Sequence, residues 1–487
     1  MPQDSAAPAR ANETRETLNV DLCIIGAGSG GLSVAAAAAA FGQRVVLIEK
    51  HKMGGDCLNY GCVPSKALLA AGKRAHAMRT SAKFGIAPVD PLIDHTAVYD
   101  HVHGVIGAIA PNDSVERFNG LGVRVITAAG RFVDRQTVEA GEYLITARRF
   151  VIATGSAPVV PPIDGLKDIV YFTNETIFDN ARKIPHLIVI GGGPIGLELA
   201  QAHRRLGSEV TVVEGMKAMG KDDPELAAVV LTRLREEGID IREGSVVSRV
   251  AGGNGAVTVT VKMGDTTGSI EGTHLLVAAG RRPNIADLGL DAAGIKFEKK
   301  GITVDAGLRT SNKRVFAIGD VAGGLQFTHV ANDHAGLVIR RALFRLPAKT
   351  TGRIVPWVTF TDPELAHAGL LETEARDKHG KINVLRWPYH ENDRAQAEHE
   401  TVGHIKVVTS AKGDILGVSI VGAHAGEIIQ MWVLAMSQKL KIKAMTDWIS
   451  PYPTYSEINK RAAFRYYAAA ASNPFVRKVI SLLAKLG

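Results

Sequence analysis

Short apolar runs separated by glycine-rich turns give the first half of the chain a strand–turn–helix–strand pattern. Leu18–Ile25 is an apolar run of the kind that forms a buried parallel strand, and it leads directly into GAGSGG at residues 26–31. An alanine-rich helical stretch continues to about residue 41, and Val45–Ile48 is the next apolar run, which ends in Glu49. This order predicts a βαβ unit at the start of an α/β domain.

The same pattern recurs about 165 residues later. Leu187–Ile190 predicts a strand, GGGPIG at residues 191–196 predicts a turn, and residues 197–206 predict a helix. Val210–Val213 predicts the next strand, which ends in Glu214. The repetition predicts two dinucleotide-binding units in one chain.

Glycines occupy equivalent positions in both turns: Gly26, Gly28 and Gly31 in the first, and Gly191, Gly193 and Gly196 in the second. Glycine at these positions allows a tight turn, close approach of the backbone to a pyrophosphate and close packing of the helix on the strand. The helix N-terminus then offers amide groups and a positive dipole end to the phosphates.

The acid that ends each second strand indicates which nucleotide binds. Glu49 and Glu214 are each placed to accept hydrogen bonds from an adenosine ribose. A carboxylate at position 214 binds a free 2′-hydroxyl and repels a 2′-phosphate. No arginine immediately follows it, and Lys217 stands alone nearby. We therefore expect NADH rather than NADPH at the second site.

Two further strand ends carry candidate cofactor contacts. Residues 123–152 alternate like strands, and the run Val151–Gly155 predicts a strand that enters a sharp turn, a common place for backbone to touch a cofactor. Val315–Ile318 predicts another strand, and Asp320 follows it, where a carboxylate suits the ribityl hydroxyls of a flavin.

The pattern changes beyond residue 354. His404–Thr409 and Ile415–Val421 predict alternating strands, and residues 426–440 predict a helix. This part predicts an α+β domain without a nucleotide pattern and is a candidate dimerisation module.

Composition limits the classes of function. The 487 residues are 46% hydrophobic with a net charge of +8, which indicates a large globular protein with a mildly basic surface. Basic residues form no dense block before the C-terminal tail, so we expect no nucleic-acid partner. No uncharged apolar run is long enough to span a bilayer, and the polar N-terminus resembles no targeting signal, so the cytoplasm is the expected location.

Residues 54–66, GGDCLNYGCVPSK, carry two of the three cysteines of the chain. Cys57 and Cys62 are close enough for a disulfide if the second begins a helix and the backbone is tight at the first. Half of a metal site is disfavoured because no second ligand pair has suitable spacing. A structural disulfide that closes so short a loop would stabilise little, so a redox-active pair is favoured. Three scattered histidines have no partners at metal-ligand spacing, so we expect them at the surface rather than in a metal site: His95, His101 and His103.

With these features in order, residues from about Leu18 to Ala470 resemble the flavin-dependent pyridine nucleotide–disulfide oxidoreductases, which include dihydrolipoamide dehydrogenase, glutathione reductase and mercuric reductase. The resemblance implies two Rossmann-like domains, which bind FAD and NAD, and a C-terminal α+β dimerisation domain in a homodimer. The expected divisions are an N-terminal tail (1–17), an FAD-binding domain in two parts (18–160 and 286–353), an NAD(P)H-binding domain (161–285), an interface domain (354–470) and a basic tail (471–487).

The resemblance also implies roles for individual residues. Cys57 matches the interchange thiol that meets the substrate, and Cys62 matches the charge-transfer thiol beside the flavin. Lys66 and Glu198 match an ion pair near the flavin ring. The remaining expected cofactor contacts are Lys50, Gly55, Asp56, Thr154, Gly155, Gly280, Arg281, Gly319, Asp320 and His329. Electrons would pass from NADH to FAD, to the Cys57–Cys62 disulfide and then to an acceptor.

The C-terminal motif departs from the disulfide-using members of the family. There a histidine precedes Pro-Thr and takes the thiol proton, whereas residues 450–457 read SPYPTYSE, with Tyr452 in its place and Glu457 kept. A phenol, with a pKa of ~10, is a poor base beside an imidazole at ~6.5. His329 and His424 are the nearby candidates for a substitute base.

Three functions remain open at this stage. The first is a dihydrolipoamide dehydrogenase-like disulfide reductase, and the second is a quinone, metal-ion or electrophile reductase that needs no histidine base. Mercuric reductases carry tyrosine at the matching position, but they also use a C-terminal cysteine pair that this chain lacks. The third is a flavoprotein redox sensor.

The last residues carry a separate pattern. Within 473–486, NPFVRKVISLLAKL, apolar residues fall at helical spacing, with three basic residues between them. Such a helix could lie on an anionic membrane, although a stripe of this kind more often packs on its own protein or on a dimer mate. The apolar positions are Phe475, Val476, Val479, Ile480, Leu483 and Leu486, and the basic ones are Arg477, Lys478 and Lys485.

Overall fold

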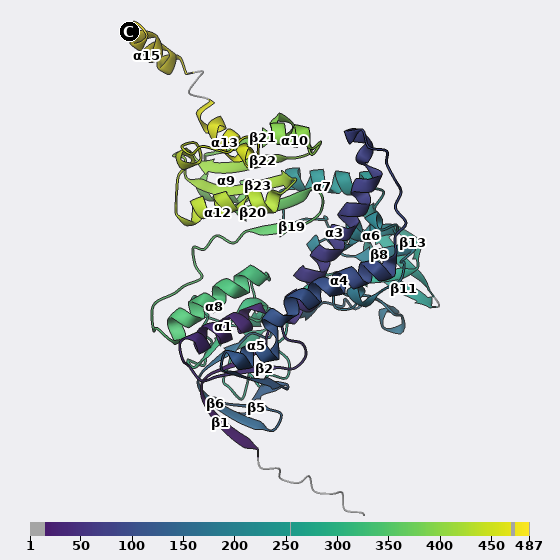
Figure 1. Cartoon of the computed structure of the whole chain (residues 1–487), viewed down its shortest axis with the longest axis vertical. Coiled ribbons are helices and arrows are strands. Elements are labelled where there is room, and N and C mark those ends of the chain that lie inside the picture. Colours follow the sequence, from purple (N-terminus) through teal and green to yellow (C-terminus); the bar gives the residue numbers. More distant parts are fainter. Residues whose placement is uncertain (1–14, 254, 469–472, 487) are drawn as a thin grey trace, which may run out of the picture. The chain divides into compact units, whose positions relative to one another are not determined.

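The computed structural model describes residues 15–253, 255–468 and 473–486, and the chain divides into two compact units. The first unit contains residues 1–59, 109–157 and 282–351, and the second contains residues 60–108, 158–281 and 352–487. Figure 1 labels the elements of both.

A seven-stranded sheet forms the centre of the first unit, in the order β3-β2-β1-β6-β5-β4, with β18 also pairing with β6. Neighbours among β3, β2, β1, β6 and β18 are parallel, whereas β4, β5 and β6 pair antiparallel. The strands are β1 (Glu16–Ile25), β2 (Val45–Glu49), β3 (Val123–Thr127), β4 (Gly130–Phe132), β5 (Thr137–Ala140), β6 (Tyr143–Ile152) and β18 (Val315–Ala317). The helices are α1 (Ser29–Ala40), α2 (Gly55–Asn59), α5 (Val115–Gly120) and α8 (Thr328–Ala342), and a short hairpin joins β16 (Phe297–Glu298) to β17 (Gly301–Ile302).

Both faces of this sheet are covered, which explains why its central strands read as continuous apolar runs. Leu22 and Ile24 belong to the core cluster that includes residues of α1 and α8, whereas Cys23 and Ile25 belong to the cluster on the other face. The alternation follows from the two-residue period of a strand. Figure 1 shows α1 and α8 side by side.

The second unit contains a parallel sheet in the order β10-β9-β8-β14 and a three-stranded antiparallel sheet, β11-β12-β13. The strands are β8 (His186–Ile190), β9 (Glu209–Val213), β10 (Asp240–Arg242), β11 (Val246–Gly253), β12 (Ala256–Met263), β13 (Thr266–Gly272) and β14 (His274–Val277). The helices of this part are α3 (Cys62–Arg79), α4 (His95–Ile109), α6 (Pro194–Arg205) and α7 (Pro224–Glu236). The chain passes between the two units within β7 (Ser156–Pro158) and β15 (Arg281–Pro283).

The same unit holds an entirely antiparallel five-stranded sheet in the order β19-β20-β23-β22-β21. Its strands are β19 (Trp357–Thr359), β20 (Glu364–Gly369), β21 (Ile382–Pro388), β22 (His404–Ser410) and β23 (Ile415–Gly422). The helices are α9 (Glu372–His379), α10 (Asp393–Ala397), α11 (Ala425–Ile428), α12 (Gln430–Ser437), α13 (Glu457–Phe464) and α15 (Pro474–Leu483). Trp432 and Tyr389 are fully buried in its core.

One element differs from the expected pattern. The helix predicted over residues 426–440 is two helices, α11 and α12, which meet at Ile429. The second helix ends at Ser437, and Lys439 adopts a left-handed backbone conformation with φ of 55°, which cannot continue a right-handed helix. Across residues 15–253, 255–468 and 473–486, no helix has both the length and the apolar character needed to cross a membrane.

Candidate active site

The first glycine turn joins β1 to α1 and can be built only with small residues. Gly26 has φ of +105°, and a Cβ at Gly31 would lie 1.9 Å from the carbonyl oxygen of Gly26. At Gly28 the nearest atom to such a Cβ is 4.0 Å away, so this side of the turn is open. Glu49, at the end of β2, accepts a 2.7 Å hydrogen bond from the N–H of Ala27. The backbone thus fixes the carboxylate beside the turn.

The second turn, between β8 and α6, repeats this geometry in the other unit. Gly191 has φ of +115°, and a Cβ at Gly196 would lie 2.0 Å from the oxygen of Gly191. Nothing lies within 4 Å of a Cβ at Gly193. Glu214 accepts a 2.8 Å hydrogen bond from the N–H of Gly192, the counterpart of the bond between Glu49 and Ala27. The chain therefore contains two equivalent glycine turns, each with a fixed carboxylate beside it, which we call cradles.

The strand ends predicted to touch a cofactor are held to other strand ends of the first unit. The hydroxyl of Thr154 donates to the carbonyl of Asn284 over 2.8 Å, and the side-chain amide of Asn284 donates back to the carbonyl of Thr154 over 2.9 Å. The hydroxyl of Ser156 donates to Asp320 over 2.5 Å. Gly155 lies between these bonds with φ of +66°, a conformation that favours glycine.

The other residues expected to contact cofactors occupy turns and helix starts. In the first unit, Gly319 and Asp320 form the turn after β18, and the N–H of Gly319 donates to Nδ1 of His334 over 3.2 Å. The remaining positions are Lys50 directly after β2, Gly55 and Asp56 at the start of α2, and His329 in the first turn of α8. In the second unit, Gly280 accepts a bond from the N–H of Val159, and Arg281 begins β15.

The two cysteines of the motif occupy different helices. Cys57 is half-buried in α2, and Cys62 is the exposed first residue of α3. The sequence predicted the helix after Cys62 but not the one that contains Cys57. Cys62 therefore lies at the N-terminal end of an eighteen-residue helix, where the helix dipole is positive. Cys23, in contrast, is wholly buried in β1, and burial raises the pKa of its thiol.

Lys66 and Glu198 form the ion pair that the resemblance implies, with 2.7 Å between Nζ and Oε2. Glu198 in α6 is only 5% exposed, and its other oxygen accepts a 2.9 Å hydrogen bond from the N–H of Phe360. The ring centroid of Phe360 lies 4.3 Å from the Lys66 ammonium, within cation–π range. The loop after β19 therefore contacts both members of the pair.

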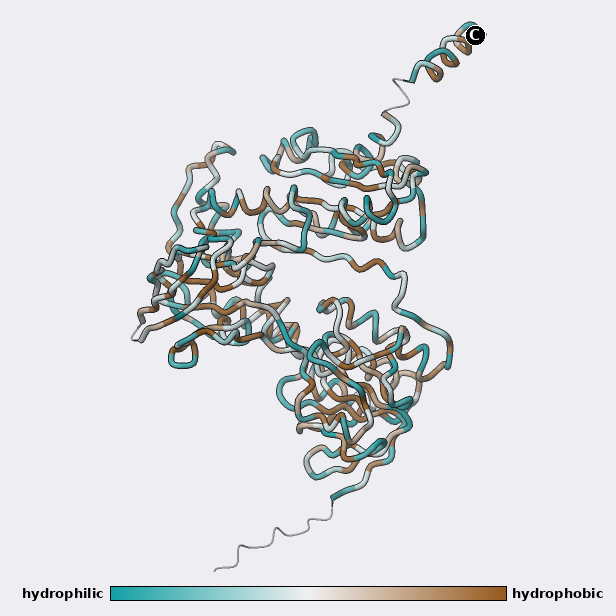
Figure 2. The backbone as a smooth tube through the Cα atoms, turned by 180° about the vertical axis from the view of Figure 1, so that it is seen from behind, coloured by the Kyte–Doolittle hydropathy of each residue, from teal (hydrophilic) through white to brown (hydrophobic). Residues whose placement is uncertain are grey.

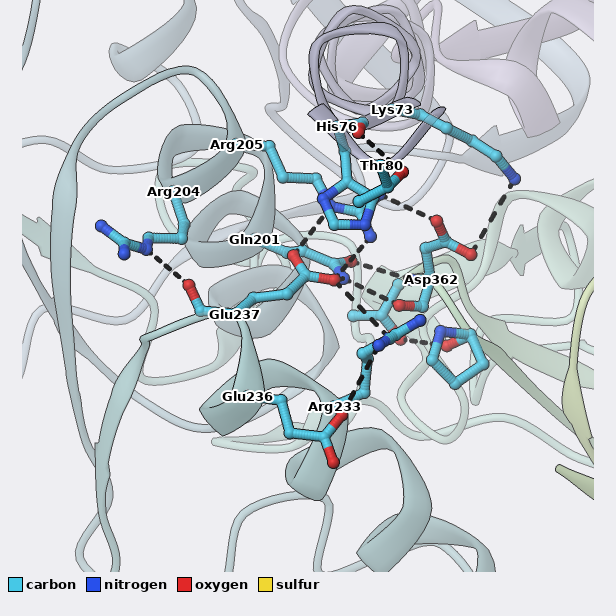
Figure 3. A network of polar contacts seen from close by, with 12 residues as sticks. Lys73, His76, Thr80, Gln201, Arg204, Arg205, Arg233, Glu236, Glu237 and Asp362 are labelled. Atoms are coloured by element: carbon cyan, nitrogen blue, oxygen red, sulfur yellow. Dashed lines mark hydrogen bonds and ion pairs between the residues drawn. The ribbon is translucent and has the colours of Figure 1, made fainter. Parts of the chain in front are cut away.

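A polar network holds that loop to α6 (Figure 3). The N–H of Asp362 donates to the side chain of Gln201 over 2.8 Å, and the Asp362 carboxylate pairs with Arg205 at 2.9 Å and with Lys73 at 3.9 Å. Arg205 also pairs with Glu237 at 2.6 Å. Burial alone would raise the pKa of Asp362, but Arg205 and Lys73 hold it below its ordinary value.

Tyr452 lies in a very different setting. Its side chain is 67% exposed, and its hydroxyl donates to Asp393 of α10 over 2.7 Å. This hydrogen bond raises the pKa of Tyr452 above the usual value of a phenol. Glu457 pairs with Arg461 within α13 at 2.7 Å. The phenol of Tyr452 is therefore bonded to Asp393. His424, a candidate for a substitute base, lies beside the ring of Tyr455.

Comparison with known proteins gives these sites a context. Residues 20–335 match the family model of the pyridine nucleotide-disulphide oxidoreductases, and residues 355–463 match the dimerisation domain of the same enzymes. The chain belongs to this family. It is 35% identical to a mercuric reductase of Lysinibacillus sphaericus over 92% of this chain and 83% of that one.

Two further relatives differ in their named activities. A dihydrolipoyl dehydrogenase of Geobacillus stearothermophilus is 33% identical over 92% of this chain and 96% of that one. A solved HOCl-induced flavoprotein disulfide reductase from Escherichia coli, also solved as a Cu(II) complex, is 27% identical. The superposition covers 91% of this chain and 99% of the reductase chain, with a TM-score of 0.82.

Membership makes this protein an FAD-dependent pyridine nucleotide–disulfide oxidoreductase, and its dimerisation domain supports a homodimer. Both cradles fit a dinucleotide, because each leaves its middle glycine open, presents a helix N-terminus and fixes an acid at the end of the second strand. The cofactors of the family are FAD and NAD(P)H.

Sequence reasoning missed three polar partners and one ring. Ser156, Asn284 and Asp393 hold predicted residues from distant parts of the chain, and Phe360 does the same for the ion pair. Two of these residues lie next to positions that the sequence singled out: Ser156 directly follows the Val151–Gly155 turn, and Asn284 lies three residues after Arg281.

Proposed function

We propose that this family member is an NADH-dependent reductase that passes electrons through Cys57 and Cys62 to a thiol-binding metal ion. The observation that carries the proposal is Tyr452, whose exposed phenol donates to Asp393 and has a raised pKa. A group that stays protonated at neutral pH cannot take the proton from the Cys57 thiol that would attack a substrate disulfide. Reduction of a small-molecule disulfide would therefore lack its base.

A metal ion avoids this requirement. Thiols bind metals as thiolates, so a metal ion displaces the thiol proton on binding and needs no protein base for that step. With Cu(II), the reduced cysteine pair gives one electron to each of two ions, returns to the disulfide and releases two protons to solvent. Overall, one NADH reduces two Cu(II) to Cu(I) and releases one proton.

The chain's own residues supply the rest of the relay. Bound FAD would supply the redox chemistry that links hydride donation by the nicotinamide to reduction of the disulfide. Lys66 would supply a fixed positive charge beside the cofactor, held in place by Glu198 and Phe360. The carboxylate of Glu214 would accept ribose hydroxyls and repel a 2′-phosphate, which supports NADH as the donor.

The test is anaerobic NADH oxidation with different acceptors: Cu(II) supplied as a glycine complex, Hg(II), lipoamide, oxidised glutathione and menadione. We expect turnover with a metal ion that Cys57→Ser abolishes. Lipoamide turnover should be low in the wild type and rise about 100-fold in Tyr452→His, the scale of a general base. The control is Tyr452→Phe, which should leave lipoamide turnover low.

Two results would overturn the proposal. One is wild-type lipoamide turnover as fast as that of Tyr452→His, which would mean that another group supplies the base. The other is menadione reduction that persists in Cys57→Ser while metal ions give no turnover. In that case the physiological acceptor would bypass the cysteines.

A further inference from the structure

The C-terminal helix, α15, is specified by its own local sequence. Asn473 caps it by accepting a 2.9 Å hydrogen bond from the N–H of Phe475, and Pro474 occupies the first helical position, where a missing N–H is harmless. Ten helical residues are nevertheless marginal in water without a surface to pack on. The local sequence therefore sets where the helix begins, but a helix this short needs a surface to pack on in order to be stable.

The two faces of α15 are sharply different. At 100° per residue, the apolar side chains fall on one broad face: Phe475, Val476, Val479, Ile480, Leu482, Leu483 and Leu486. The opposite, narrow face carries four polar residues: Arg477, Lys478, Ser481 and Lys485. Figure 2 shows hydrophobic and hydrophilic positions alternating along this helix, as such a division requires.

The apolar face has no cover within the described part of the chain. No residue of α15 is buried. Phe475 is 74% exposed, and Ile480, Leu482, Leu483 and Leu486 are each more than half exposed. A continuous apolar face of this kind marks an interaction site rather than ordinary scattered surface residues.

The charge of this helix indicates what kind of surface its apolar face binds. Residues 473–486 contain three basic residues and no acid, and all three lie on the polar face. In that arrangement long basic side chains reach the headgroups of anionic lipids while the apolar face enters the acyl boundary. The helix is about 15 Å long, roughly half the ~30 Å hydrocarbon core, so it suits the surface of a bilayer. The match to the dimerisation domain ends at residue 463, before the helix begins.

We infer that α15 is an interfacial helix that binds the surface of anionic membranes. One such helix binds weakly, but a homodimer carries two copies, and binding of the second becomes intramolecular. The inference is independent of which acceptor the enzyme reduces.

The test is co-sedimentation of the full-length, FAD-loaded protein with vesicles. Equimolar phosphatidylcholine and phosphatidylglycerol should bind it on the order of 100-fold more tightly than phosphatidylcholine alone, since each basic residue near the surface contributes about fivefold. Raising the salt concentration should remove most of this difference.

A matched pair of variants separates the two faces. Ile480→Asn places an amide on the apolar face and should weaken binding at least about tenfold. Ser481→Asn places the same amide on the polar face and should bind as the wild type does. Neither should change NADH oxidation, because neither residue belongs to the candidate active site.

Three results would overturn the inference. The wild type could fail to bind either vesicle, or it could bind both equally and without salt dependence, which would remove the role of charge. Alternatively, Ile480→Asn could change the molecular mass measured by light scattering, which would mean that the helix packs on the dimer mate.

Discussion

Lys66 and Tyr452 both belong to the second unit, and both occupy positions that the resemblance assigns to the active site, but they are held in very different ways. Lys66 contacts Glu198 and the ring of Phe360, and the loop that carries Phe360 is itself fixed by Asp362. Tyr452 is mostly exposed and contacts Asp393. A group held from several sides is already organised within one chain. Tyr452 lies within the match to the dimerisation domain and is held at its hydroxyl by Asp393.

The largest effect is expected from removing the acid that organises the Lys66 region. Glu198→Ala leaves the lysine without its partner and the N–H of Phe360 without an acceptor. We expect NADH oxidation to fall about 100-fold, as for the loss of a preorganised electrostatic contact. The free energy of unfolding should fall by about 2 kcal/mol, because the ion pair and the hydrogen bond to Phe360 are both lost. The loss should be no larger, since the lysine is partly exposed and can be hydrated instead.

The matched control for that variant is Glu198→Gln, which keeps an acceptor for the Phe360 N–H but loses the charge. It should recover most of the stability measured by urea unfolding but little of the activity. Equal activity in Glu198→Gln and the wild type would mean that the negative charge has no part in catalysis.

A second tightly held region predicts a pH dependence. Glu225 at the start of α7 accepts two hydrogen bonds from Arg386 of β21, at 2.7 and 2.8 Å, and lies 3.0 Å from the buried Lys406. These bonds, Arg386 first, lower the pKa of Glu225 from 4.5 to about 2. Because the folded pKa is depressed, the stabilisation is complete above the unfolded value and is lost as the pH falls from 4.5 towards 2.

Glu225→Gln should therefore lower the free energy of unfolding at neutral pH by about 1 kcal/mol, a modest value because the carboxylate is partly exposed. The difference from the wild type should shrink as urea unfolding is repeated at decreasing pH towards about pH 3. A difference that stays constant with pH would show that packing, not charge, is responsible.

The comparison also shows where sequence reasoning succeeds and where it stops. The βαβ units were predictable because their contacts are local and periodic, and β1, β2, β8 and β9 begin within two residues of the expected positions. The Lys66–Glu198 pair was predictable only through the family resemblance. Phe360 and Asp393 were not, because the residues they bond to are 162 and 59 positions away in the chain and neither carries a motif.

The ring of Phe360 offers a finer test of the Lys66 region. Phe360→Leu keeps the backbone N–H bond to Glu198 but removes the aromatic face beneath the ammonium. Since a partly exposed cation–π contact is worth about 1 kcal/mol, we expect roughly a fivefold loss in kcat for NADH oxidation with little change in KM. Phe360→Tyr, which keeps the face, should restore the rate. A loss in both variants would point to the shape of the loop instead.

The smallest effect should come from the partner of Tyr452. Asp393→Asn removes the carboxylate whose hydrogen bond raises the pKa of the phenol, so that pKa should fall back towards the usual value of tyrosine. An ultraviolet titration, with Tyr452→Phe subtracted to isolate this one residue, measures the shift directly. Because the phenol remains protonated at neutral pH in both proteins, metal-ion turnover should change less than twofold. If turnover instead fell well beyond twofold, the phenol held by Asp393 would be positioning the metal ion or the cysteines during turnover. Tyr452 would then be as much a part of catalysis as Lys66, although a single chain fixes it far less firmly.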